Sequence, residues 1–227
     1  MELNADFSQR AVMHGASMDW VSSPTPGVDR RMFDRIGDEV ARATSIVRYA
    51  PDSLFPEHVH SGGEEYFVLE GTFQDDEGDF PAGTYVRNPP QSRHTPGSEP
   101  GCVIFVKLWQ FDPQDRTQVR VNSHDVVPVQ SDERLGVELL PLYRDERENV
   151  RLERWAPGTS VELDVPGGLE LLVLDGDLTE GGEVFSYQSW LRLPAGASLL
   201  AQAGQDGCTV WVKSGHLSQP QRAPSAG

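Results

Sequence analysis

The sequence predicts an all-β protein built from two repeated units. Short runs of β-branched, aromatic and aliphatic residues, such as Tyr66–Leu69 and Val210–Val212, are bounded by glycine, proline or acidic turn residues. The 22 glycines and 17 prolines favour many short strands joined by tight turns. The apolar runs do not alternate with polar residues, which indicates strands covered on both faces, as in a closed barrel or a sandwich.

Four segments of the chain recur in the same order, which indicates an internal duplication. RYAP at 48–51 returns as RWAP at 154–157, GGEEYFVLEG at 62–71 as GGLELLVLDG at 167–176, PAG at 81–83 as PAG at 194–196, and GCVIFVK at 101–107 as GCTVWVK at 207–213. We therefore expect one unit at 27–128 and a second at 129–216, with a mobile N-terminal arm at 1–26 and a disordered tail at 217–227. Residues 31–43 could form a short helix, but Gly37 and Thr44 favour a strand or loop.

Charge and composition narrow the classes of partner. The chain has 19 basic and 35 acidic residues, a net charge of −16 that would repel nucleic acid and anionic membrane surfaces. The first six residues do not resemble a signal peptide, and no apolar run approaches the roughly 20 residues that span a bilayer. Cys102 and Cys208 sit at matching positions on apolar strands, so we expect reduced core thiols in a cytoplasmic protein.

Three histidines and a glutamate in the first unit have the spacing of a metal site. Side chains two residues apart on a strand share a face, so His58 and His60 can reach one ion. Gly62 and Gly63 supply a turn that can return Glu64 to the same point, and His94 enters from a later strand or loop. The predicted site holds one divalent ion; zinc, iron, manganese, nickel and copper all suit three imidazoles and a carboxylate.

The same residues carry a family resemblance. The run His58-x-His60-x3-Glu64-x6-Gly71 resembles the first cupin motif, with Asp52 in place of the glycine expected ahead of it. The second motif is matched by Gly83, Pro89 and His94, whereas Gln91 replaces a glycine and Ser98 an asparagine. The segments GGEEYFVLEGTF, PAGTYVRNPP and GCVIFVK are similar to the ChrR-type cupins, and the resemblance covers most of residues 17–216.

The resemblance implies two tandem cupin barrels, that is, double-stranded β-helices of the jelly-roll kind. In the ChrR anti-sigma factor a zinc-binding cupin follows a sigma-binding domain with its own His/Cys zinc motif. No cysteine precedes Cys102 here, so we expect that domain to be missing from this chain. Zinc is the metal that the resemblance favours, and a homodimer through exposed strands is compatible with it.

Two functions from different classes follow from the resemblance. The first is a metal-binding sensor or regulatory module of an oxidative-stress response. The second is an iron-dependent dioxygenase acting on a small diketone or hydroxyaryl ketone bound at the metal. Cupins host many chemistries, so the fold cannot decide between them.

A comparison of the two units separates the predicted site from its scaffold. Aligning the glycine pairs puts Leu169 where Glu64 stands, with Leu163 and Val165 near the places of His58 and His60. The second unit is therefore expected to be metal-free with an apolar core. Tyr66 shares the face of Glu64 and is expected either to line the pocket or to fill space. The remaining histidines with no partner at ligand spacing are not expected to function; they are His14, His124 and His216.

Overall fold

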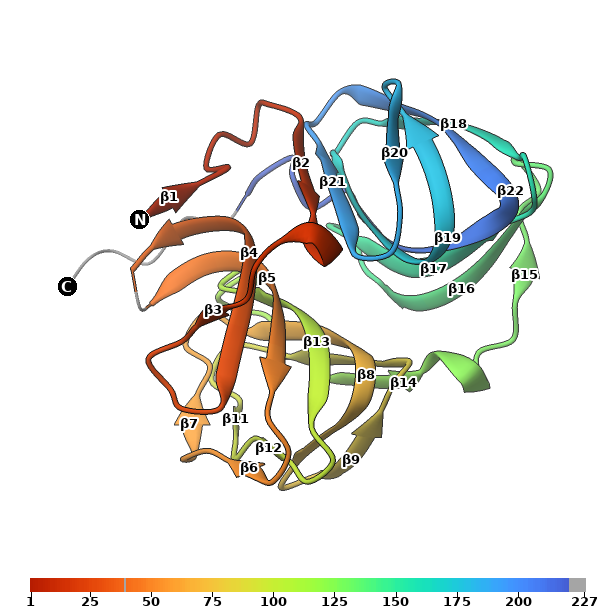
Figure 1. The fold of residues 1–227 in the computed structure, drawn as a ribbon. Coiled ribbons are helices and arrows are strands. Elements are labelled where there is room, and N and C mark those ends of the chain that lie inside the picture. Colours follow the sequence, from red (N-terminus) through yellow and green to blue (C-terminus); the bar gives the residue numbers. More distant parts are fainter. Residues whose placement is uncertain (39, 221–227) are drawn as a thin grey trace. The chain divides into compact units, whose positions relative to one another are not determined.

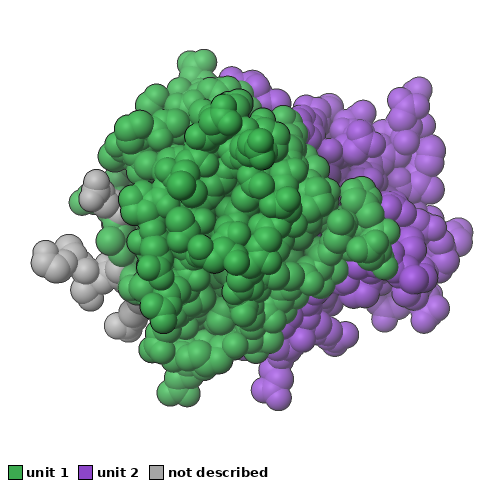
Figure 2. Space-filling model, turned by 90° about the horizontal axis from the view of Figure 1, so that it is seen from below, with its two compact units in different colours: residues 1–5, 19–125, 221–227 green, residues 6–18, 126–220 purple. Residues whose placement is uncertain are grey.

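The structure is a computed structural model that describes residues 1–38 and 40–220. Its described residues divide into two compact units (Figure 2). Unit 1 comprises residues 1–5 and 19–125, and unit 2 comprises residues 6–18 and 126–220. Each unit is a curled, multistranded antiparallel sheet (Figure 1). The all-β fold class is confirmed, and this sheet layout agrees with two tandem cupin barrels.

Unit 1 is organised around one long sheet with a small sheet beside it. The main path runs β1 (Glu2–Leu3), β4 (Val28–Gly37), β5 (Ala41–Tyr49), β13 (Cys102–Leu108), β8 (Glu64–Asp75), β10 (Thr84–Asn88) and β14 (Val119–Asn122). The shorter members are β3 (Val21–Ser22), β6 (Ser53–Leu54), β9 (Gly78–Pro81) and β12 (Gly97–Ser98). A separate two-stranded sheet pairs β7 (His58–Val59) with β11 (Arg93–His94). Of the segment 31–43, residues 31–37 lie in β4 and residues 41–43 in β5, so these residues form strands and not a helix.

Unit 2 repeats this plan. Its path runs β15 (Val129–Gln130), β16 (Val137–Arg144), β17 (Asn149–Trp155), β22 (Ala197–Ser214), β19 (Leu169–Glu180), β21 (Ser189–Leu193) and β2 (Ala11–His14), with β18 (Ser160–Val165) on β22 and β20 (Glu183–Phe185) on β19. The equivalent strands β8 and β19 each start directly after a glycine pair. The repeated pairs also occupy equal register positions, since Glu65 faces Lys107 and Glu170 faces Lys213.

The two units differ in what fills them. In unit 2, Val165 and Leu169 belong to a continuous apolar core at 2% and 0% exposure, and Leu163 packs against it. In unit 1 the corresponding place is taken by buried polar groups, His60 and Glu64. The expectation of an apolar core in the second unit is therefore met.

The ends of the chain differ from the expected arm and tail. Residues 1–26 contain three strands, β1 and β3 in unit 1 and β2 in unit 2, because their backbone groups pair with β4 and β21. In the expected tail 217–227, Leu217 is buried and residues 221–227 lie outside the described residues. No helix in the described part of the chain is long and apolar enough to cross a membrane.

Both cysteines are free and buried in the apolar clusters of their units, as predicted. Burial raises the pKa of Cys102 to about 11 and that of Cys208 to about 12. A thiolate is the reactive form of cysteine, so both side chains are unreactive packing groups at neutral pH.

Candidate metal centre

Three histidines converge in unit 1 because β7 pairs with β11. His94 lies directly opposite His58 in this antiparallel pair, and the chain continues so that the His60 N–H donates to the Ser92 carbonyl at 2.9 Å. The three imidazole rings stand edge-on to one another, with centroids 4.9 Å (His58–His60), 5.0 Å (His58–His94) and 4.6 Å (His60–His94) apart. Two segments more than 30 residues apart thus supply one cluster.

The ring nitrogens face a common point. One nitrogen from each histidine lies within 4.8 Å of the other two. Within residues 1–38 and 40–220, this is the one group of three or more His, Cys, Asp or Glu side chains close enough to share a metal ion. His60 Nε2 and His94 Nε2 are buried and form no hydrogen bond. Buried nitrogens without hydrogen bonds are costly, and a shared cation would satisfy both.

Glu64 stands beside this cluster as the first residue of β8. Its Oε2 lies 3.4 Å from His60 Nε2 and 3.7 Å from His94 Nε2, and the Asn88 amide donates to the same oxygen at 3.4 Å. Two ligands of one tetrahedral ion at about 2.1 Å bonds are separated by about 3.4 Å. The spacing of Glu64 from His60 and His94 therefore fits an ion shared with these two rings, whereas the set of side chains that all lie within 4.8 Å of one another comprises the three histidines without Glu64.

Groups behind the ligands orient two of the rings. His94 Nδ1 donates to Asp75 Oδ2 at 3.1 Å, and the Asp75 side chain is 0% exposed. His58 Nδ1 donates to the Pro56 carbonyl at 3.2 Å. Both contacts leave Nε2 as the outward nitrogen, which is the usual arrangement of metal-binding histidines.

The electrostatics of the two buried rings differ. Burial lowers the pKa of His60 and outweighs the charge of Glu64. Burial also acts to lower the pKa of His94, but the hydrogen bond to Asp75 and the charge of Glu64 raise it overall. Burial acts to raise the pKa of Asp75, but the hydrogen bonds from His94 and from the Glu77 N–H, together with nearby positive charge, lower it overall. The carboxylate behind His94 therefore stays ionised and increases the electron density of that ring.

The turn before Glu64 is held by packing. A Cβ on Gly62 would lie 2.1 Å from the Trp109 ring, and one on Gly63, at φ +77°, would lie 2.5 Å from the Phe111 ring. Two aromatic side chains thus press against the backbone that leads into β8. The glycines are needed for this close approach, which fixes where Glu64 begins.

Two residues that differ from the cupin motifs have an unusual backbone conformation. Asp52 and Gln91, which replace family glycines, have φ values of +56° and +75°. Gln91 is held there because its N–H donates to the His60 carbonyl at 2.9 Å. Side chains are disfavoured in this left-handed region, so the glycine preference of the family has a local cause.

A cavity of about 560 Å³ opens onto the cluster, and His58, His60 and Glu64 are among its lining residues. Its other walls are largely apolar, including Val47, Ile104 and Trp109. A concave, mostly apolar pocket with a few polar groups is typical of a small-molecule site.

Tyr66 lies behind this cavity and is absent from its lining. It is 1% exposed, belongs to the apolar cluster of unit 1, and its ring centroid is 4.7 Å from that of Phe73. Its hydroxyl is buried without a hydrogen bond. Tyr66 does face inward as Glu64 does, but one step deeper along β8.

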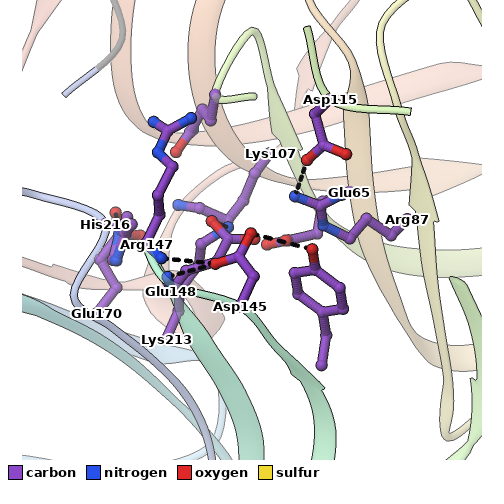
Figure 3. Close-up of polar contacts among 12 residues, drawn as sticks. Glu65, Arg87, Lys107, Asp115, Asp145, Arg147, Glu148, Glu170, Lys213 and His216 are labelled. Carbon is purple, nitrogen blue, oxygen red and sulfur yellow. Dashed lines mark hydrogen bonds and ion pairs between the residues drawn. The ribbon is translucent and has the colours of Figure 1, made fainter. Parts of the chain in front are cut away.

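The other histidines occupy polar contacts away from the cluster. In unit 2, His216 Nε2 lies 3.0 Å from Glu170 Oε1 (Figure 3), and His14 Nε2 lies 2.9 Å from Glu183 Oε1. His124 is exposed in the middle of a short 3-10 helix of unit 1, Ser123–Asp125.

Sequence reasoning missed Asp75 as a partner of His94, because an acidic residue in a turn-like segment has no distinguishing spacing.

Similarity to known proteins agrees with this architecture. Residues 8–112 match the family of ChrR cupin-like domains, and this range contains all four candidate ligands. No curated protein matches the chain in sequence.

Solved structures share the fold at low sequence identity. A candidate dioxygenase from Nostoc punctiforme has a TM-score of 0.75 and 16% identity, with 97% of this chain and 87% of that chain covered. The pirin YhhW from Escherichia coli, solved with nickel(II), has a TM-score of 0.63 and 16% identity, covering 91% and 99%. Bacillus subtilis oxalate decarboxylase, a protein with Mn(II) centres, has a TM-score of 0.64 and 10% identity, covering 90% and 77%. These likenesses show that the chain has a cupin fold, within which residues 8–112 match the family of ChrR cupin-like domains.

Proposed function

We propose that unit 1 holds one divalent metal ion on His58, His60, Glu64 and His94, and that this centre acts on a small organic molecule in the adjoining cavity. The observation that carries the proposal is the opening of the histidine cluster onto a cavity of about 560 Å³. A purely structural metal site is normally closed, whereas a catalytic one is accessible to its substrate.

When bound, the metal supplies Lewis-acid polarisation of a substrate oxygen. The protein residues do the rest: Asp75 holds the ring of His94, Glu64 contributes negative charge, and the apolar walls exclude water from the reacting groups. Four protein ligands would complete the coordination of a tetrahedral zinc ion, whereas octahedral iron, manganese or nickel would keep two coordination positions free for substrate. Metal identity is therefore the property that most directly bears on activity.

The cavity supports the enzymatic reaction that the family resemblance implies, a dioxygenase acting on a small diketone or hydroxyaryl ketone. Both substrate types carry oxygen atoms that a metal can bind and a carbon skeleton that apolar walls can hold. The likeness to a candidate dioxygenase is compatible with this choice.

The regulatory alternative is supported by the match to the ChrR cupin-like domain. A redox sensor needs a reactive group, and the high pKa values of Cys102 and Cys208 make their thiols poor candidates. Regulation would then have to act through the metal ligands themselves. An accessible cavity is not required for that role, which is why we place the enzyme first.

Metal analysis of protein purified without added metal tests the site. We expect close to one ion per chain in the native protein and in the control His124→Ala, and loss of the ion in Glu64→Ala and His94→Ala. An unchanged metal content in both ligand variants, or two ions per chain, would refute the assigned site.

Oxygen uptake tests the reaction. The iron-loaded protein is supplied with 2,4-pentanedione and with 2-hydroxyacetophenone, and oxygen consumption is followed with an electrode. We expect consumption with at least one compound and none in His94→Ala. A metal-loaded protein that consumes no oxygen with either would remove the dioxygenase proposal and favour regulation.

A further inference from the structure

Two arginines of one strand line the cavity of unit 1. Arg30 and Arg35 both belong to β4 and both contribute to the cavity wall (β4 in Figure 1). Arg35 is buried at 6% exposure and Arg30 is half-buried. This placement is unexpected in a chain of net charge −16, in which acidic side chains outnumber basic ones.

A β-bulge delivers both side chains to the same face. Residues five apart on a regular strand point to opposite faces. In β4 the register shifts between Met32 and Asp34, so that Arg30 pairs with Val47 and Arg35 with Ala43, two partners that both line the cavity. Bulges commonly redirect a side chain in this way next to functional sites.

The two guanidinium groups have no carboxylate partner in the cavity. Among the described residues Arg30 forms no ion pair or side-chain hydrogen bond, and Arg35 donates to the Asp38 backbone carbonyl. The Asp38 carboxylate is 90% exposed and accepts from the chain's N-terminal ammonium at 2.8 Å. Burial lowers the pKa of Arg35, the like charge of Arg30 lowers it further, and both side chains line the same cavity.

The acidic residues that line the cavity are engaged elsewhere. Glu57 lies 3.8 Å from Arg93, and Glu64 stands at the histidine cluster. The cavity therefore has a positive end at Arg30 and Arg35 and a metal-binding end at the histidines. Planar, fixed guanidinium groups are suited to bind a carboxylate through paired hydrogen bonds.

The register also gives the distance between the two ends. Arg35 pairs with Ala43, Ala43 with Leu108, and Leu108 with Glu64, so one row crosses four strands. Neighbouring strands lie about 4.8 Å apart, which separates the two backbone positions by about 14 Å along the sheet. Side chains reaching inward from both ends leave room for a short chain or one aromatic ring. The walls between them are apolar, formed by residues such as Val47, Ile104 and Val106.

We infer that the cavity binds a small organic acid, with its carboxylate at Arg30 and Arg35 and its hydrocarbon body along the apolar walls. The further assignment, that the opposite end of this acid meets the metal, rests on the function proposed above. The anion site itself rests on the arginines alone. An inorganic anion would use the same guanidinium groups but would leave the apolar walls without a partner.

The inference is tested by calorimetric titration with cinnamate and with its neutral amide, cinnamamide. Native protein is expected to bind cinnamate at least about tenfold more tightly than the amide, the factor of one charge-assisted contact. Arg30→Met and Arg35→Met should each remove most of this preference, and Arg35→Lys should retain part of it. The matched control is Arg31→Met, since Arg31 stacks on the Trp20 ring at 4.1 Å and does not line the cavity.

The outcomes distinguish this inference from the metal proposal. Carboxylate preference that persists in His94→Ala and in chelator-treated protein supports the arginine site even if no metal is found. Preference that survives both arginine substitutions, or vanishes only when metal is removed, would assign the anion to the metal and overturn the inference. Equal binding of phosphate and cinnamate would overturn the organic-acid assignment. Arg35→Lys also covers the case in which Arg35→Met fails to fold.

Discussion

The hydrogen bond between Asp75 and His94 offers the sharpest test of how the site is built. Asp75→Asn keeps the shape of the side chain and removes its charge. The bond is 3.1 Å long between side chains that are 0% and 4% exposed, so water cannot replace it. A hydrogen bond to a charged group contributes about 1.5–3 kcal/mol. Asparagine can still accept from Nδ1 through its amide oxygen, so only part of this is lost.

We therefore expect metal affinity to fall by about tenfold in Asp75→Asn and by up to about a hundredfold in Asp75→Ala. Competition between the protein and a chromophoric chelator, with cobalt or zinc as the metal, measures the dissociation constant. Asp79→Asn is the matched control, since Asp79 is an exposed carboxylate in the same hairpin and accepts a hydrogen bond from Gln74, away from the histidines. An affinity in Asp75→Asn equal to that of the control would refute the argument that Asp75 supports the ligand set.

Three further changes probe the scaffold. Leu169→Ala should lower the free energy of unfolding by about 2–5 kcal/mol in urea denaturation because Leu169 is 0% exposed, while metal content per chain stays constant; a loss of metal would contradict the separation of site and scaffold. Gln91→Gly should raise the unfolding free energy by about 0.5–1 kcal/mol, as left-handed strain outweighs glycine's entropy cost; a decrease would show that the side chain stabilises this turn. Glu153 is buried, which acts to raise its pKa, but the charge of Arg151 and the hydrogen bond from Arg134 lower that pKa overall. The contribution of Glu153 to the stability of the fold is therefore present above its unfolded-state pKa and is lost as pH falls through its folded-state pKa. Glu153→Gln should therefore cost about 3 kcal/mol at pH 7 and progressively less in acid, measured by thermal denaturation across pH; a cost independent of pH would refute the assignment to charge.

The strands could largely be predicted because their signals are local. Apolar runs such as Tyr66–Leu69 are bounded by glycines with left-handed backbone, and the repeated glycine pairs mark the starts of β8 and β19 in both units. The N-terminal residues could not be placed, since β2 forms only by pairing with β21, and Met13 lies opposite Trp190. A strand of four residues has too little pattern to indicate a partner so distant in sequence.

The convergence of the three histidines could be predicted from the sequence, whereas the surroundings of the candidate site could not. His58, His60 and Glu64 carry their signal in spacing alone, and the histidine cluster does lie in one place. Asp75 is placed at the site by the hairpin of β8 and β9, and Arg35 is turned into the cavity by the bulge in β4. Strand alternation read from the sequence would put Arg35 on the face opposite Arg30, and a single inserted residue reverses that result. Such irregularities leave little trace in composition or periodicity.

The division of the chain also has a consequence for its biosynthesis. Residues 1–5 belong to unit 1, 6–18 to unit 2, 19–125 to unit 1 and 126–220 to unit 2, so the backbone passes between the units three times. No single proteolytic cut can release either unit intact. During translation, β2 emerges long before its partner β21, so β2 is already available when β21 is made. Without β2, the edge of β21 would stay unpaired and could serve as a template for wrong pairing between chains. Deletion of the first 18 residues should therefore increase aggregation of the nascent protein more than it changes the metal site.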